Sequence, residues 1–144
     1  MKRILLAFSI LIFSTAAFAQ SEKVQNNGEA KATMSEYEKA KADQKAAIFN
    51  KYEDINASIE KDDLAGAKQK YADAQKMMEQ SLESDKKFLR AAKTEAEKSQ
   101  LTRKIDTKQR LYDASKDLSN ATDAKAAKRY AIFVMEFANV TQIM

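Results

Sequence analysis

The chain has 144 residues, a formal net charge of +4, two glycines and no proline, cysteine or histidine. This length allows one domain with a modest core, and the scarcity of Gly and Pro argues against an antiparallel sheet, whose turns need these residues. Without His or Cys the chain cannot build a Ser-His-Asp or Cys-His catalytic centre, a usual zinc site or a disulfide. Abundant Ala, Lys, Glu and Gln are strong helix formers, so the composition predicts an all-α fold.

Residues 1–19 have the pattern of a cleavable signal peptide. The chain starts with the basic sequence MKR, continues with an apolar run over residues 4–13, and has the small residues Ala17 and Ala19 at the cleavage positions. The apolar run is shorter than the roughly 20 residues that cross a bilayer. We therefore predict cleavage after Ala19 and export to a periplasm or out of the cell, with no transmembrane segment left in the mature chain.

Cleavage would change the charge balance. The signal carries Lys2 and Arg3 and no acid, so its removal leaves 23 of the 25 basic residues against 21 acidic residues, a net charge of +2. Because nucleic acids are bound by concentrated basic surfaces, we expect no nucleic-acid partner.

The first helix is predicted to begin at Ser35, after a polar and flexible leader over residues 20–33. Ser35 and Glu38 form an S-x-x-E capping box, in which each side chain accepts from the other's backbone N–H. Apolar residues then recur mostly every three or four positions, with one longer step through Lys41 and Gln44, as expected for one face of a helix. This stripe consists of Met34, Tyr37, Ile48, Tyr52, Ile55 and Ile59.

A second helix is predicted after Asp62-Asp63, since either carboxylate can cap its first turn. One face of this helix holds Leu64, Ala67, Tyr71, Ala74, Met78 and Leu82. The stretch Asp63-Leu64-x-x-Ala67-x-x-x-Tyr71-x-x-Ala74 resembles the second half of a tetratricopeptide repeat, although the first half is not matched and no 34-residue period recurs. The resemblance implies an Ala-rich helical hairpin and no repeat array.

The helical pattern continues from Ser81 to about Leu118, which is too long for one ordinary helix. A turn could fall near Ser84-Asp85 or near residues 98–100, and we expect a break near residues 94–100. Residues 119–123 (SNATD) predict a loop and cap, followed by a last helix from Asp123 to about Gln142. Its segment 130–135 (YAIFVM) is apolar on every side, so we expect burial around most of that helix.

Candidate ligands for metals or cofactors have simpler structural interpretations. The acidic groups Asp62-Asp63, Glu53-Asp54 and Glu95 with Glu97 lack calcium-loop spacing and are expected at caps or on the surface. Met77-Met78, with Met34 and Met135, could hold Cu(I), but they lie within helical stripes and are expected in the core. We predict no cofactor and no metal, and there is no Gly-rich phosphate loop.

The charge distribution is the most informative feature for function. Residues 35–85 hold twelve acids and eight bases, a net charge of −4, whereas residues 86–110 hold nine bases and three acids, a net charge of +6. The two halves could neutralise one another within the fold or across a dimer. Alternatively, the basic half could form a surface for an acidic partner. The candidate residues for this surface are Lys86, Lys87, Arg90, Lys93, Arg103, Lys104, Lys108 and Arg110.

Together these features predict a signal peptide over residues 1–19, a leader over 20–33 and a domain over 34–144. The domain is expected to be a small antiparallel helical bundle of three to four long helices with coiled-coil-like packing. Its predicted role is structural or binding, not enzymatic, with a protein, an envelope surface or a second copy as partner. The alternatives are a holdase-like periplasmic chaperone, or a binder of an acidic partner through a basic helix over residues 86–110.

Overall fold

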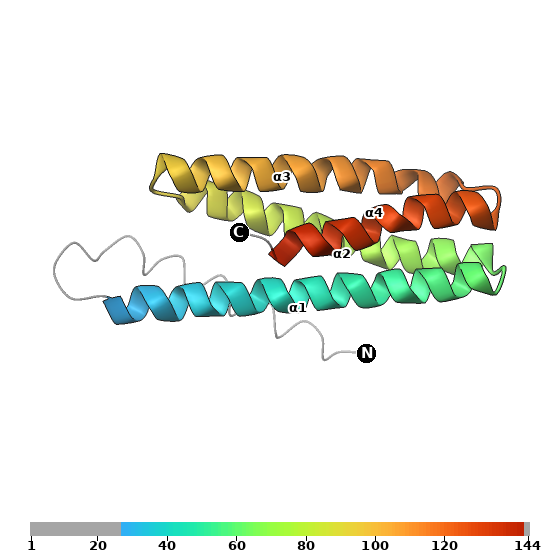
Figure 1. The fold of residues 1–144 in the computed structure, drawn as a ribbon, viewed down its shortest axis with the longest axis horizontal. Helices are drawn as coiled ribbons and strands as arrows, with labels where there is room; N and C mark the ends of the chain where they lie inside the picture. The colour runs from blue at the N-terminus through green and yellow to red at the C-terminus, as the bar shows by residue number, and fades with distance from the viewer. Residues whose placement is uncertain (1–26, 143–144) are drawn as a thin grey trace. The chain divides into compact units, whose positions relative to one another are not determined.

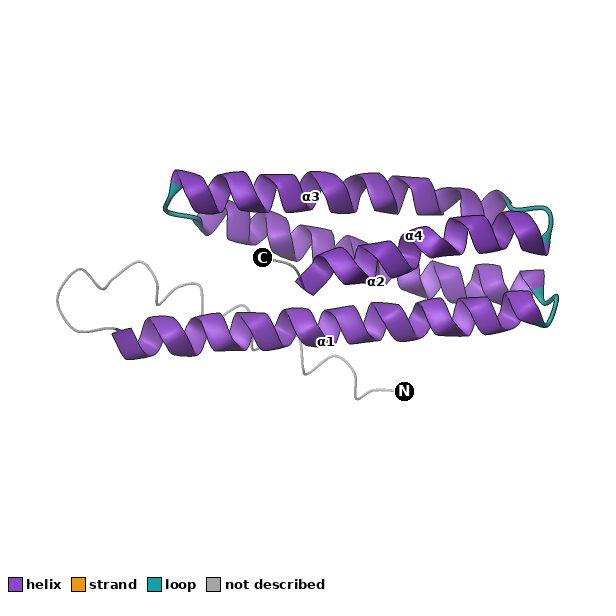
Figure 2. Ribbon diagram, in the orientation of Figure 1, coloured by secondary structure: helices purple, strands orange, loops and turns teal. Residues whose placement is uncertain are grey.

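A computed structural model describes the backbone of residues 27–142 and the side chains of residues 36–142. The predicted signal peptide and residues 20–26 of the predicted leader lie outside these ranges. The described residues form four α-helices, α1 (Asn27–Glu60), α2 (Leu64–Ala91), α3 (Glu95–Ser115) and α4 (Ala124–Gln142), and one 3-10 helix, η3 (Lys116–Asn120). They contain no strand, so the all-α prediction is confirmed for this part of the chain (Figure 2).

Residues 35–142 pack as one helical bundle with short connections over 61–63, 92–94 and 121–123. Contacts between side chains place α1 beside α2 and α4, because Lys51 pairs with Asp73 of α2 and Lys45 donates to Gln142 of α4. α3 packs against α2 and α4. Successive helices run in opposite directions, and α4 ends before the level of the α2–α3 turn (Figure 1).

The core follows the apolar stripes expected from the sequence. In α2, Ala67, Tyr71, Ala74 and Met78 are fully buried, and Leu82 nearly so. Ile48, Ile55 and Ile59 of α1 are buried as well, and Phe137 is the large aromatic side chain of the core from α4. The stripes therefore identify the inward faces correctly for the first two helices.

The α1–α2 connection is set by two aspartates. Asp62 has a positive φ of 58°, and the N–H groups of Asp62 and Asp63 donate to the carbonyls of Ile59 and Ser58. This is the hydrogen-bond pattern of a Schellman motif, with Asp62 in the left-handed position that glycine usually takes. The Asp63 carboxylate then accepts from the N–H of Gly66 at 2.8 Å, which confirms the predicted cap of α2.

One predicted boundary is wrong, and another lies at the edge of its expected interval. α1 begins at Asn27, so Ser35 lies inside the helix and not at its start. The second break lies at residues 92–94, at the start of the expected interval, and Thr94 forms a capping box with Glu97. Residues 86–110 are consequently the end of α2, a turn and most of α3, and not one basic helix.

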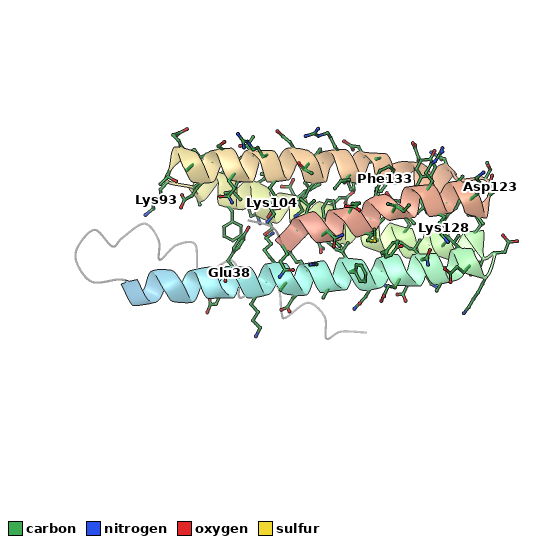
Figure 3. The ribbon with its side chains drawn as sticks, viewed as in Figure 1. Glu38, Lys93, Lys104, Asp123, Lys128 and Phe133 are labelled. Carbon is green, nitrogen blue, oxygen red and sulfur yellow. The ribbon has the colours of Figure 1, made fainter. Side chains whose placement is uncertain are left out.

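The last helix also differs from its prediction in one respect. Asp123 caps α4 as expected, accepting from the N–H of Ala126 at 2.7 Å. Within residues 130–135, Ala131 and Val134 are fully buried, and Ile132, at 44%, is the one exposed side chain. Phe133, which is labelled in Figure 3, is partly buried, as are Tyr130 and Met135, so the expected burial of this segment holds except at Ile132.

Candidate functional site

The eight basic candidate residues divide between surface and core. Lys87, Arg90, Lys93, Arg103 and Arg110 are exposed, and Lys86 is partly exposed. Lys104 and Lys108 instead point into the bundle, with exposed fractions of 7% and 0%. The prediction that these two lysines belong to a surface is therefore wrong, because the inward face of α3 passes through them.

Lys108 belongs to a buried ionic cluster between three helices. We use the name lysine cluster for Lys41 of α1, Asp85 of α2, and Lys104 and Lys108 of α3. Both oxygens of the Asp85 carboxylate are paired: Oδ1 lies 2.6 Å from Nζ of Lys41, and Oδ2 lies 2.6 Å from Nζ of Lys108. All four side chains are buried, so the bundle encloses three ammonium groups around one carboxylate.

Neutral side chains complete the hydrogen bonds of two of these lysines. Lys108 donates to Oγ of Ser81 at 2.6 Å, and Ser81 donates to the side-chain oxygen of Gln44 at 3.1 Å. Lys41 donates to the same Gln44 oxygen at 3.2 Å and to Oγ of Ser84 at 3.3 Å. Nζ of Lys108 also lies 4.9 Å from the ring centre of Phe137, on α4, at a distance suited to a cation–π contact.

The pKa values of the cluster show the competition between burial and pairing. Burial lowers the pKa of Lys108 to about 8, against the opposing effect of Asp85. Burial likewise lowers the pKa of Lys41 and of Lys104. For Asp85, burial by itself would raise the pKa, but the charges and hydrogen bonds of Lys108 and Lys41 outweigh it and the pKa lies below its usual value. The carboxylate is therefore ionised at neutral pH, and the positive charge around it exceeds its own.

Lys104 differs from the other two lysines because its Nζ is buried without a hydrogen-bond partner. A buried ammonium group normally has acceptors, because desolvation without compensation is costly. The hydroxyl of Tyr37, on α1, is likewise buried without a partner. The ring of Tyr37 packs edge-on against Phe88 at 4.2 Å, at the same end of the bundle as the lysine cluster.

Lys104 also lines an open pocket of about 520 Å³ on one face of α3. α4 contributes Val140, near its end, to the lining. Its lining contains a guanidinium, an ammonium, two hydroxyls and a carboxamide, and no carboxylate. The lining residues are Ala96, Ser99, Gln100, Arg103, Lys104, Thr107 and Val140.

The sequence does contain a signal for the lysine cluster: polar residues stand at inward positions of three helices. Lys41 and Gln44 interrupt the apolar stripe of α1, Ser81 and Asp85 continue the stripe of α2, and Lys108 lies three residues after the buried Ile105. Each polar residue thus occupies an inward position of its own helix. Only the register of the helices shows that these positions meet at one level.

Several of the other candidate residues have structural roles. Asp63 and Glu97 form caps, Met78 is buried in the core, and Met77 packs against it. Within the described part of the chain, no three acidic side chains gather as a metal site would require, and no helix is both long enough and apolar enough to cross a bilayer. The chain matches no protein-family model, and comparisons with curated proteins and with solved structures give no match.

Proposed function

We propose that this chain is an exported, non-catalytic helical-bundle protein that binds an acidic envelope surface. The observation that supports the proposal most strongly is the state of the basic side chains in residues 86–110. Lys87, Arg90 and Arg110 are exposed and form no ion pair in the described part of the chain. They are therefore available to an acidic partner.

Internal neutralisation accounts for only part of the basic stretch. Lys108 pairs with Asp85, which belongs to the acidic half of the chain. Lys86 and Lys98 pair with Glu83 and Glu95, each one turn away on the same helix. Exposed pairs of this kind contribute little to stability. The charge asymmetry between residues 35–85 and 86–110 thus remains largely on the surface, where it can attract anionic groups over a distance set by the salt concentration.

A holdase-like chaperone is the second candidate, and the described residues give it less support. A surface for unfolded clients needs contiguous apolar area. The large apolar side chains that are exposed between residues 36 and 142 are Phe88, at 36%, and Ile132, at 44%. They lie on different helices, α2 and α4.

The proposal of a non-catalytic role rests on the sequence. Without His and Cys, the remaining titratable chemistry is that of carboxylates, lysines and tyrosines. Among the side chains of residues 36–142, Asp85 is the buried carboxylate, and each of its oxygens lies 2.6 Å from a lysine Nζ. A carboxylate held in this way is a structural ion-pair partner, with no free oxygen for a substrate proton.

A vesicle-binding experiment tests the proposal. The protein starting at Gln20 is expected to sediment with vesicles containing phosphatidylglycerol, less so with rising salt, and not with phosphatidylcholine vesicles. The variant with Lys87, Arg90 and Arg110 changed to Gln should lose this binding. A control variant with Lys39, Lys61 and Lys76 changed to Gln removes the same charge from exposed positions elsewhere. This control should still bind the vesicles. Equal loss in both variants, or no binding by the wild type, would contradict the proposal.

Export is tested separately by the mass of the protein recovered from outside the cytoplasm of a bacterial host. The expected mature chain begins at Gln20. Recovery of the full 144-residue chain from the cytoplasm would contradict export.

A further inference from the structure

The lysine cluster carries more positive charge than its own residues neutralise. Lys41, Lys104 and Lys108 contribute three ammonium groups, and Asp85 is the carboxylate that faces them. With all four ionised, the cluster has a net charge of +2. Uncompensated charge in a protein interior is unfavourable, so it normally marks a deprotonated group or a bound counter-ion.

Lys104 links the lysine cluster to the pocket on α3. Asp85 is held at 2.6 Å by Lys41 and by Lys108, which leaves Lys104 as the member without an acceptor. Lys104 lines the pocket, and its flexible four-carbon chain allows Nζ to turn toward a ligand there. Arg103, at the next position, also lines the pocket, is exposed, and forms no ion pair within the described residues.

The remaining lining groups suit an oxyanion. The Ser99 hydroxyl and the Gln100 amide can donate hydrogen bonds, whereas the Thr107 hydroxyl already donates to the Arg103 carbonyl at 2.9 Å. No carboxylate lines the pocket, so nothing there repels an anion. Residues 96, 99, 100, 103, 104 and 107 lie on one stripe of α3, which presents these donors together.

We propose that this pocket binds a phosphate group, with Lys104 and Arg103 supplying positive charge and Ser99 and Gln100 supplying hydrogen bonds. A phosphate dianion would match the net charge of the lysine cluster and give Nζ of Lys104 the acceptor that it lacks. Guanidinium groups also match phosphate oxygens in geometry. The site deepens the proposed function, because it names the chemical group that the bundle recognises on an acidic surface. The group can come from free phosphate or from a phospholipid headgroup.

Thermal unfolding with the protein starting at Gln20 tests this site. At constant ionic strength and pH 7.5, replacing chloride with inorganic phosphate should raise the Tm saturably, by roughly 4 °C or more. The second arm uses a short-chain, water-soluble phosphatidic acid, which presents the same group on a lipid. A rise with inorganic phosphate identifies free phosphate as a ligand. A rise with the lipid alone identifies the headgroup.

The decisive variant is Lys104→Met, which keeps the length and apolar stem of the side chain. Removing an unpartnered buried charge should leave the Tm in chloride equal to or above that of the wild type, and the response to phosphate should disappear. Lys87→Met removes an exposed lysine outside the pocket and should retain the response. The inference is overturned if neither ligand stabilises the wild type, or if Lys104→Met responds as the wild type does.

The outcomes separate this site from the proposed surface. Vesicle binding that depends on Lys87, Arg90 and Arg110 while neither phosphate ligand has an effect would keep the proposed function and reject the pocket. A phosphate response without vesicle binding would do the reverse.

Discussion

Among substitutions that remove one charged group, Asp85→Asn is expected to lower the free energy of unfolding most. The two carboxylate oxygens form ion pairs with Lys41 and Lys108 at 2.6 Å each, and all three side chains are at most 3% exposed. The amide keeps the shape of the side chain but removes the negative charge. Two ammonium groups then remain buried without a counter-ion, in addition to Lys104.

The magnitude follows from two independent estimates. Breaking a buried ion pair by removing one partner costs about 3 to 5 kcal/mol. Alternatively, a buried lysine can escape by losing its proton. Bringing its pKa from the ordinary 10.5 down to 7 costs about 5 kcal/mol, at about 1.4 kcal/mol for each pKa unit. We therefore expect a loss of about 3 to 5 kcal/mol in the free energy of unfolding at pH 7.

Urea unfolding followed by circular dichroism at 222 nm measures this loss, with Asp73→Asn as the matched control. Asp73 is also on α2 and pairs with a lysine of α1, but at 3.8 Å and with a side chain that is 57% exposed. The control should change stability by less than about 0.5 kcal/mol. The deficit of Asp85→Asn should also shrink between pH 7 and pH 10, as the buried lysines lose their protons. A loss below 1 kcal/mol, or a deficit that grows with pH, would refute the reasoning.

Three further predictions concern single side chains. The pKa of Lys108 is lowered to about 8 from an unfolded value near 10.5, so the unfolded chain binds more protons between these values. The free energy of unfolding should therefore rise by roughly 1 to 3 kcal/mol from pH 8 to pH 10. Urea unfolding measures this rise, which should be smaller in Lys108→Met. The charged groups that face Lys108 are those of Lys41, Lys104 and Asp85. Above pH 10 the trend should reverse, because Tyr37 and Tyr71 have raised pKa values and keep protons that the unfolded chain loses. Phe137→Ala removes a fully buried ring and should cost about 3 to 5 kcal/mol, whereas Phe133→Ala, on the partly buried side of α4, should cost under half as much; equal costs would contradict the orientation of α4. Thr94→Ala removes the N-cap of α3 and should lower the free energy of unfolding by about 1 kcal/mol, while Thr102→Ala, at an exposed position inside the same helix, should not lower it.

The sequence predicted the inward faces of the bundle well, because burial follows a simple period. Tyr71 and Met78 are buried where the stripe of α2 placed them. The same reasoning held for residues 130–135 except at Ile132, since a single apolar side chain can remain exposed without structural consequence. Burial depends on neighbouring helices, which a period within one helix does not describe.

Helix ends were harder to predict, because cap signals compete with helix propensity. Ser35 and Glu38 match a capping box, but the preceding residues include Glu, Ala and Lys, and α1 continues through the site from Asn27. Conversely, Thr94 and Glu97 match the same signature and do form the cap of α3. The same four-residue signature therefore predicts a cap only where the residues before it end the preceding helix, as residues 92–94 do.

The lysine cluster could not be predicted from single helices. Lysines are usually surface residues, so Lys104 and Lys108 are expected outside the core. Their burial depends on Asp85, which lies opposite them on α2. Lysine is rarely buried unless it is paired. Predicting the cluster requires the inward faces of α1, α2 and α3 to be aligned, and this alignment depends on the register between the helices.

The most direct test of the central claim, that the excess charge of the lysine cluster creates an anion site on α3, is a nuclear magnetic resonance titration of the isotope-labelled protein with inorganic phosphate. The claim predicts saturable shifts of the backbone amides of residues 99–107 and of the side-chain Cε of Lys104, with little change at Lys87 or Lys76. Shifts spread evenly over the exposed lysines, with no saturation at Lys104, would contradict it.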